Sequence, residues 1–116
     1  MKSFPAMLVS LAMASPLAGT SGFAADTLTA PTPVEEGAAL LIRGDVAKAV
    51  TTYTVALKDT GLPNDRRATI LNDRAVANVR LGETKAALED YNRAVELFPE
   101  YPVAYNNRGN LLLALG

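Results

Sequence analysis

The stretch KAALEDYNRAVELFPEYPVAYNNRG, residues 85–109, contains small residues, an aromatic residue and a proline at regular distances. Ala87, Tyr91 and Ala94 have the i, i+4, i+7 spacing that places side chains on one face of a helix. Pro99 ends that helix, because proline has no amide hydrogen and clashes with the turn before it. The stretch therefore predicts a helix with one packed face and a defined end.

The pattern occurs twice in the chain. Five residues of one helical face recur 38 residues later, namely Ala49, Val50, Tyr53, Ala56 and Leu57 as Ala87, Leu88, Tyr91, Ala94 and Val95. Gly37 recurs as Ala75 after the same interval and as Gly109 after a further 34 residues. A repeat of this length is typical of stacked helix pairs. We expect the small residues to let two antiparallel helices approach closely, and the tyrosines to fill the space beside the contact.

Helical sequence extends from residue 33 to the end of the chain. Thr32 is expected to cap the first helix, with Pro33 at its first position and Glu35 completing a capping box. The pattern breaks at Gly44, at DTGLPND (59–65), at Gly82 and at FPEYP (98–102). These breaks predict helices over 33–43, 46–59, 65–81, 84–98 and 102–115, and no strand pattern of comparable strength is present in the sequence.

These residues carry a family resemblance. From about Pro31 to Gly116 the chain resembles the tetratricopeptide repeat (TPR) family, in which helix–turn–helix units stack on one another. The central copy matches the family's small, alanine, aromatic and proline positions with Ala75, Ala87, Tyr91 and Pro99, whereas Leu71 and Asn78 depart from its usual Trp and Tyr. The resemblance implies an all-α fold of antiparallel helix–turn–helix repeats, stacked as a short right-handed α-solenoid.

The expected repeat domain, 33–116, has three parts: a first helix pair over 33–63, a second over 64–101, and the first helix of a third pair over 102–116. In the family a partner helix would follow this last one, so we expect the chain to be a fragment. The alternative is that the leucine-rich end NLLLALG is buried against another copy of the chain.

The first 24 residues differ in composition from the rest. Lys2 precedes the apolar run Ala6–Ala14, and small residues up to Ala24 follow. This order is typical of a secretory signal peptide cleaved after Ala24. An uncleaved membrane anchor is the alternative, although a span needs about 20 apolar residues and prolines interrupt this one. We therefore expect a signal peptide (1–24), an extended Thr/Pro-rich tether (25–32), no membrane span after cleavage, and export to the periplasm.

The residue inventory argues against catalysis. The chain has no His and no Cys, and its serines, Ser3, Ser10, Ser15 and Ser21, all lie in the predicted leader. The usual nucleophile–base pairs cannot be formed without these residues, and no clustered Asp/Glu loop of the calcium type is present. An enzyme would have to use Thr, Tyr or Lys, or a part beyond this chain. We therefore predict a protein that is not an enzyme, with no catalytic residue, metal site or cofactor.

The charged residues favour structural roles. Glu89 and Asp90 point about 100° apart on a helix, so they cannot flank one substrate as an acid–base pair does. We expect Asp90 to form an ion pair with Arg74 or Arg108. The net charge is −1 and adjacent basic residues occur once, at 66–67, so we predict no nucleic-acid partner.

The resemblance also implies where a partner would bind. In the TPR family the first helices of successive pairs line a concave groove. By register, the candidate binding residues are Asn72, Asp73, Val76 and Arg80 from the central pair, Thr69 near the rim, and Asn106, Asn107 and Asn110 from the next helix. Amide side chains both donate and accept, so they suit the backbone of an extended peptide. The alternative is that these are ordinary solvent-facing residues.

The sequence therefore predicts a non-catalytic scaffold module of an exported protein, which binds a protein or peptide whose identity it does not specify. Two alternatives stay open. The first is an accessory repeat region of a longer cell-envelope enzyme or assembly factor. The second is a self-associating structural module, a homo-oligomer formed through the last helix.

Overall fold

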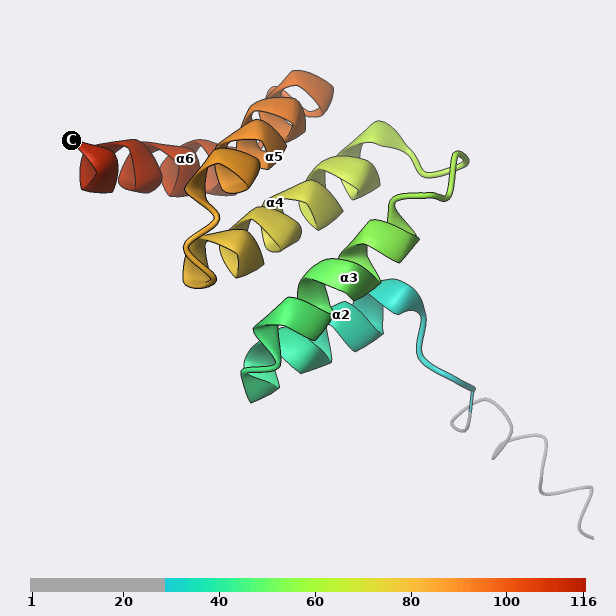
Figure 1. The fold of residues 1–116 in the computed structure, drawn as a ribbon. Coiled ribbons are helices and arrows are strands. Elements are labelled where there is room, and N and C mark those ends of the chain that lie inside the picture. The colour runs from blue at the N-terminus through green and yellow to red at the C-terminus, as the bar shows by residue number, and fades with distance from the viewer. Residues whose placement is uncertain (1–28) are drawn as a thin grey trace, which may run out of the picture. The chain divides into compact units, whose positions relative to one another are not determined.

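The computed structural model describes residues 29–116, and these contain five helices (Figure 1). They are α2 (Pro33–Arg43), α3 (Val46–Ala56), α4 (Asn64–Arg80), α5 (Thr84–Leu97) and α6 (Pro102–Leu115). The predicted all-helical fold is confirmed for this part of the chain, in which no strand is present. The predicted signal peptide (1–24) and the first residues of the predicted tether lie outside the described residues.

Helix α3 ends earlier than the sequence predicted, at Ala56 instead of residue 59. The backbone amides of Lys58 and Asp59 bond to the carbonyls three residues before them, at 3.1 and 3.2 Å. These bonds span three residues instead of the four of an α-helix, so they close a tight turn and the helix does not continue. The other predicted helix ends differ from the structure by no more than one residue.

Local signals at the ends of α2 act as expected. The Thr32 hydroxyl accepts a hydrogen bond from the Glu35 amide, and the Glu35 carboxylate accepts one from the Thr32 amide at 3.3 Å. These bonds form the predicted capping box, and the Thr32 side chain lowers the pKa of Glu35. Gly44 and Gly82 have φ of 89° and 81°, a left-handed conformation that side chains disfavour. Each glycine therefore turns the chain back into the second helix of its pair.

Consecutive helices pack antiparallel within the unit formed by residues 31–116 (Figure 1). α2 packs on α3, α4 lies between α3 and α5, and α6 packs on α5. Tyr53 and Tyr91, at equivalent repeat positions, are only 1% and 2% exposed, as the repeat predicted. A Cβ atom on Gly37 would lie 2.7 Å from the Tyr53 ring, so the small residue is what lets α2 and α3 cross this closely.

Asp90 pairs with Arg74, one of the two partners that the sequence left open. The Arg74 Nε and Nη2 atoms donate to the two Asp90 oxygens, each at 2.8 Å, and this bond raises the pKa of Arg74. Arg74 Nη1 also donates to the Thr54 hydroxyl at 2.9 Å, so one guanidinium joins α3, α4 and α5. Arg108 instead donates to the Asn92 side chain at 2.9 Å. The Asp90 carboxylate is therefore structural, as predicted.

Candidate functional site

A groove with a volume of about 320 Å³ runs between α4 and α6. We call it the α4–α6 groove, and its lining residues are Val76, Val79 and Arg80 of α4, Tyr91 of α5, and Asn107, Asn110, Leu111 and Ala114 of α6. The structure thus brings together four of the eight residues named above as candidates for binding a partner, namely Val76, Arg80, Asn107 and Asn110. Residues 76, 79 and 80 share one stripe of α4, and residues 107, 110, 111 and 114 share one stripe of α6.

Asn72 occupies a different place from the one expected of a groove residue. It is only 3% exposed, and its side-chain oxygen accepts a hydrogen bond from Asn107 Nδ2 at 3.1 Å. Its own amino group donates to Asp73 Oδ1 at 3.2 Å. A buried amide needs such partners, because leaving it unpaired costs free energy. Asn72 therefore joins α4 to α6 and orients Asn107, and its side chain is not displayed on an open surface.

Asp73 is half-buried beside this amide pair and makes no ion pair within residues 29–116. Burial raises the pKa of Asp73, and the hydrogen bond from Asn72 opposes that change. The pKa of three tyrosines, Tyr53, Tyr91 and Tyr101, is raised mainly by burial and further by the negative charge of Asp73. Asp73 therefore places a carboxyl group beside the buried amide pair, whereas the charged side chain that lines the groove itself is Arg80.

The remaining predicted residues take different places relative to the groove. The exposed Arg80 donates from Nη1 to the carbonyl of Leu41 at 3.2 Å, which joins the end of α2 to α4 while Arg80 also lines the groove. Asn106 is exposed on α6 and does not line the groove. The rim candidate Thr69 donates its hydroxyl to the carbonyl of Asp65 at 3.0 Å.

Apart from Val76, the apolar residues of the groove lining were not predicted from the sequence. Val79, Leu111 and Ala114 were not singled out as groove residues, and Tyr91 was assigned only to packing. The i, i+3 spacing of Val79 from Val76 would have indicated the first of them. Leu111 and Tyr91 are buried between helices, so only the packing of α5 and α6 shows that they form the groove floor.

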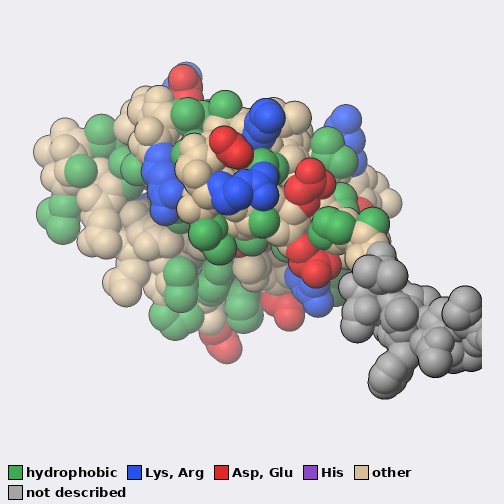
Figure 2. Space-filling view, turned by 90° about the horizontal axis from the view of Figure 1, so that it is seen from below, with side chains coloured by type: hydrophobic (Ala, Val, Ile, Leu, Met, Phe, Trp, Pro, Cys, Tyr) green, Lys and Arg blue, Asp and Glu red, His purple; other side chains and the backbone are tan. Residues whose placement is uncertain are grey.

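The surface of the described residues carries charges of both signs. Acidic and basic side chains alternate over the face shown in Figure 2. Among residues 29–116, no cluster of three metal-ligating side chains is present and no helix is long and apolar enough to span a bilayer.

We expect the free energy of unfolding to fall as the pH rises from about 10 to about 12. Burial raises the pKa of Tyr53 to about 12, whereas an unfolded tyrosine titrates near 10. Below about pH 10 both states keep the proton and the stabilisation is complete. Above about pH 10 the tyrosine of the unfolded chain loses its proton first. The stabilisation is therefore lost as the pH rises through the pKa of the folded state, at a cost on the order of 1–2 kcal/mol.

Urea unfolding at a series of pH values measures this effect. Tyr53→Phe removes one of the titrating groups, so its stability should depend less steeply on pH in this range. Tyr91 and Tyr101 retain part of the dependence, because their pKa is raised as well. Equal slopes for the variant and the parent protein would contradict the assignment to Tyr53.

Comparison with known proteins agrees with this architecture. Residues 69–116 match the family described as TPR repeat. This part of the chain is therefore similar to TPR repeats, and the five packed antiparallel helices are consistent with such repeats.

One relative is similar over part of its length. The chain is 41% identical over 64 residues to the photosystem I assembly protein Ycf3 of Rippkaea orientalis (strain PCC 8801 / RF-1). The aligned region is 55% of this chain and 36% of that protein, so the chain spans little more than a third of the relative's length. No solved structure matches the chain.

Proposed function

We propose that the helical part of this protein is a non-catalytic scaffold that binds an extended segment of another protein in the α4–α6 groove. The observation that carries the proposal is the lining itself, in which amides on α6 face an apolar stripe on α4. Asn107 and Asn110 can donate to and accept from a peptide backbone. Val76, Val79 and Leu111 can take an apolar side chain of the bound segment, because its burial is favourable.

Part of the site is ordered before the partner arrives. The hydrogen bond to Asn72 fixes one amino hydrogen of Asn107 and leaves its side-chain oxygen available to a ligand. A side chain that is already held loses little entropy on binding, so its hydrogen bonds contribute more to the affinity. Arg80 is the one charged side chain in the groove lining, so a largely neutral segment suits the groove.

The relative's name and the leader composition extend the proposal to the whole protein. Similarity to a photosystem I assembly protein supports a role in the assembly of a multiprotein complex, with the repeats holding a subunit during assembly. In this proposal the stacked repeats form a short right-handed α-solenoid. The signal-like composition of residues 1–24 supports export to the periplasm.

Self-association through the last helix is the alternative function. Leu112, Leu113 and Leu115 on α6 are 48%, 81% and 54% exposed. Burial of these side chains against a second copy would be favourable. Sedimentation of the purified protein separates the two functions, because the scaffold proposal expects no dimer that persists on dilution.

A pair of groove substitutions tests the scaffold function. We expect Val79→Glu/Asn110→Ala to weaken peptide binding at least about tenfold, because it places a charge on the apolar stripe and removes an amide. Peptides are selected by binding of the parent protein to an immobilised peptide library, and dissociation constants are then measured by fluorescence anisotropy. Val79 is 38% exposed and Asn110 is exposed, so folding should change little.

The matched control, Val55→Glu/Asn106→Ala, makes the same chemical changes outside the groove. Val55 is 49% exposed on α3, and Asn106 is exposed on α6 without lining the groove. We expect its affinity to stay within about twofold of the parent value. An equal loss in both variants would rule out the groove as the binding site.

A further inference from the structure

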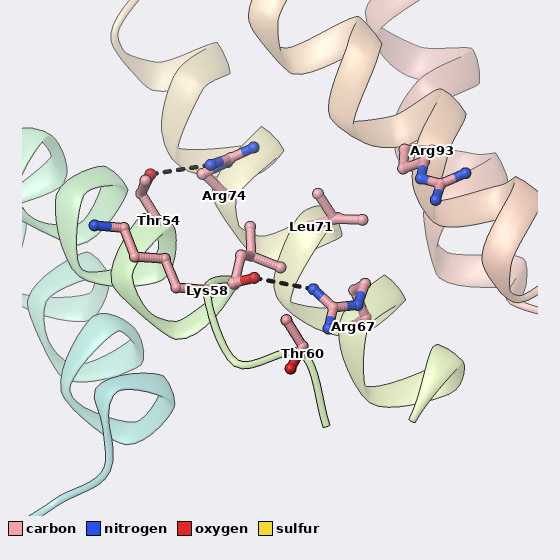
Figure 3. Close-up of a pocket in the computed structure, with 8 residues that line it drawn as sticks. Thr54, Lys58, Thr60, Arg67, Leu71, Arg74 and Arg93 are labelled. Atoms are coloured by element: carbon pink, nitrogen blue, oxygen red, sulfur yellow. Dashed lines mark hydrogen bonds between the residues drawn. The ribbon is translucent and has the colours of Figure 1, made fainter. Parts of the chain in front are cut away.

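A second pocket, with a volume of about 510 Å³, lies between α3, α4 and α5 (Figure 3). We call it the outer pocket, and its lining residues are Thr54, Leu57, Lys58, Thr60, Arg67, Leu71, Arg74 and Arg93. Four of these eight side chains are cationic and none is acidic. The outer pocket shares no residue with the α4–α6 groove. Residues 67 and 76 lie about 180° apart around α4, so the two sites use opposite sides of that helix.

The charges around the outer pocket do not cancel. The charge of Arg74 is neutralised by Asp90, and Arg93 has an exposed partner, Glu96, at 3.1 Å. Lys58 and Arg67 have no ion pair within residues 29–116. An excess of positive charge therefore remains, and an open pocket with this charge attracts anionic groups.

The hydrogen bonds that the four cationic side chains of the outer pocket already make indicate which kind of anion the pocket can bind. Arg67 donates to the backbone carbonyls of Leu57 and Asp59, and all three donor nitrogens of Arg74 have partners. These two arginines supply charge but few free N–H groups. Lys58 and Arg93 lie on opposite sides of the pocket, Lys58 in the turn after α3 and Arg93 on α5 (Figure 3). Both side chains are exposed, so Lys58 can turn toward a ligand and Arg93 can exchange its exposed partner Glu96 for a carboxylate of the ligand.

A compact anion needs donors that converge on one point, whereas here the available cations are separated by an apolar floor. Leu57 and Leu71 form that floor. The arrangement suits an extended chain in which acidic side chains lie on both sides of an apolar one. We propose that the outer pocket binds an acidic segment of a partner protein, with an apolar side chain on the floor and carboxylates at Lys58 and Arg93.

This second surface differs in charge from the first. The groove lining contains one cationic side chain, Arg80, whereas the outer pocket is lined by four cationic side chains. An acidic segment is therefore attracted more strongly to the outer pocket than to the groove.

The experiment uses the full chain and a short fluorescein-labelled peptide in which glutamates flank two leucines. We expect the parent protein to bind it in low salt and to lose affinity as salt is added. Lys58→Glu/Arg93→Glu should weaken binding at least about tenfold. The amide NMR signals of Thr54, Thr60 and Leu71 should shift on titration with the peptide.

The matched control, Lys48→Glu/Lys85→Glu, changes the net charge by the same amount at exposed residues that do not line the outer pocket. The affinity of this control variant for the acidic peptide should stay within about twofold of the parent value, once the effect of the changed net charge is subtracted. An equal loss in this control would overturn the proposal, and so would the absence of binding to the parent protein.

Two further outcomes would also overturn it. Displacement of the peptide by low concentrations of pyrophosphate would assign the pocket to a compact anion. Loss of acidic-peptide binding in the groove variant Val79→Glu/Asn110→Ala would place the peptide in the groove. Because that variant should bind the acidic peptide normally, a failure of the outer pocket is distinguishable from a failure of the groove.

Discussion

Replacing Arg74 by alanine is expected to lower the free energy of unfolding by about 3 kcal/mol. The substitution leaves the Asp90 carboxylate in a nearly closed environment without its partner, since the Asp90 side chain is only 9% exposed. It also removes the donor to the Thr54 hydroxyl on α3. The expected loss of free energy of unfolding lies at the low end for a buried pair, because 22% of the Arg74 side chain remains in contact with solvent. Urea unfolding followed by circular dichroism measures the change.

Arg93→Ala is the matched control for this prediction. It breaks an ion pair of similar length, 3.1 Å, whose side chains are 58% and 65% exposed. Exposed pairs contribute only about 0.2–1 kcal/mol, so the loss should be small. Arg74→Met/Asp90→Leu should recover much of the loss, because apolar side chains can replace a buried pair. If Arg74→Ala cost no more than Arg93→Ala, the structural role of the buried pair would be wrong.

Alanine at two equivalent glycines is expected to have opposite effects. Gly37→Ala should destabilise the protein by about 1–3 kcal/mol, because the new methyl group would overlap the Tyr53 ring. The Cβ position lies 2.7–2.9 Å from three ring atoms, and Tyr53 is 1% exposed, so the ring has no room to move away.

Gly109→Ala should instead stabilise the protein by about 0.5–1 kcal/mol. Gly109 has the same place in the repeat, but a Cβ there meets no atom within 4 Å among the described residues. The remaining effect is the lower entropy cost of alanine in a helix. Urea unfolding of both variants tests the pair. A change of the same sign in the two variants would show that close packing at Gly37 does not control the outcome.

Much of the fold could be predicted because its causes are local. Capping by Thr32, left-handed turns at Gly44 and Gly82, and a break at Pro99 depend on residues close in sequence. The burial of Tyr53 and Tyr91 was predictable as well, because each copy of the repeat presents the same face to its neighbour. The early end of α3 was not predicted, since the i→i+3 bonds of Lys58 and Asp59 depend on how the following loop turns.

The candidate site was predicted only in part. Asn72 and Asn107 are both amides on first helices of the repeat, yet the structure buries one and leaves the other at the groove. Their hydrogen bond depends on the separation of α4 and α6, which no local pattern specifies. The choice of Arg74 over Arg108 as the partner of Asp90 depends in the same way on tertiary packing, because α4 and α6 both pack on α5 and Arg108 meets Asn92 there instead.

The amino-acid sequence by itself determined that five helices form within residues 33–115, where each begins and, except for α3, where each ends to within a residue, and which face is apolar. These properties follow from backbone hydrogen bonds and side-chain periodicity over a few residues. Only the tertiary structure decided which polar side chains are paired inside, and it assembled both pockets. Lys58 and Arg67 are close in the chain and meet through the loop between α3 and α4, whereas Arg93 joins them in one charged surface only when α5 packs on α4.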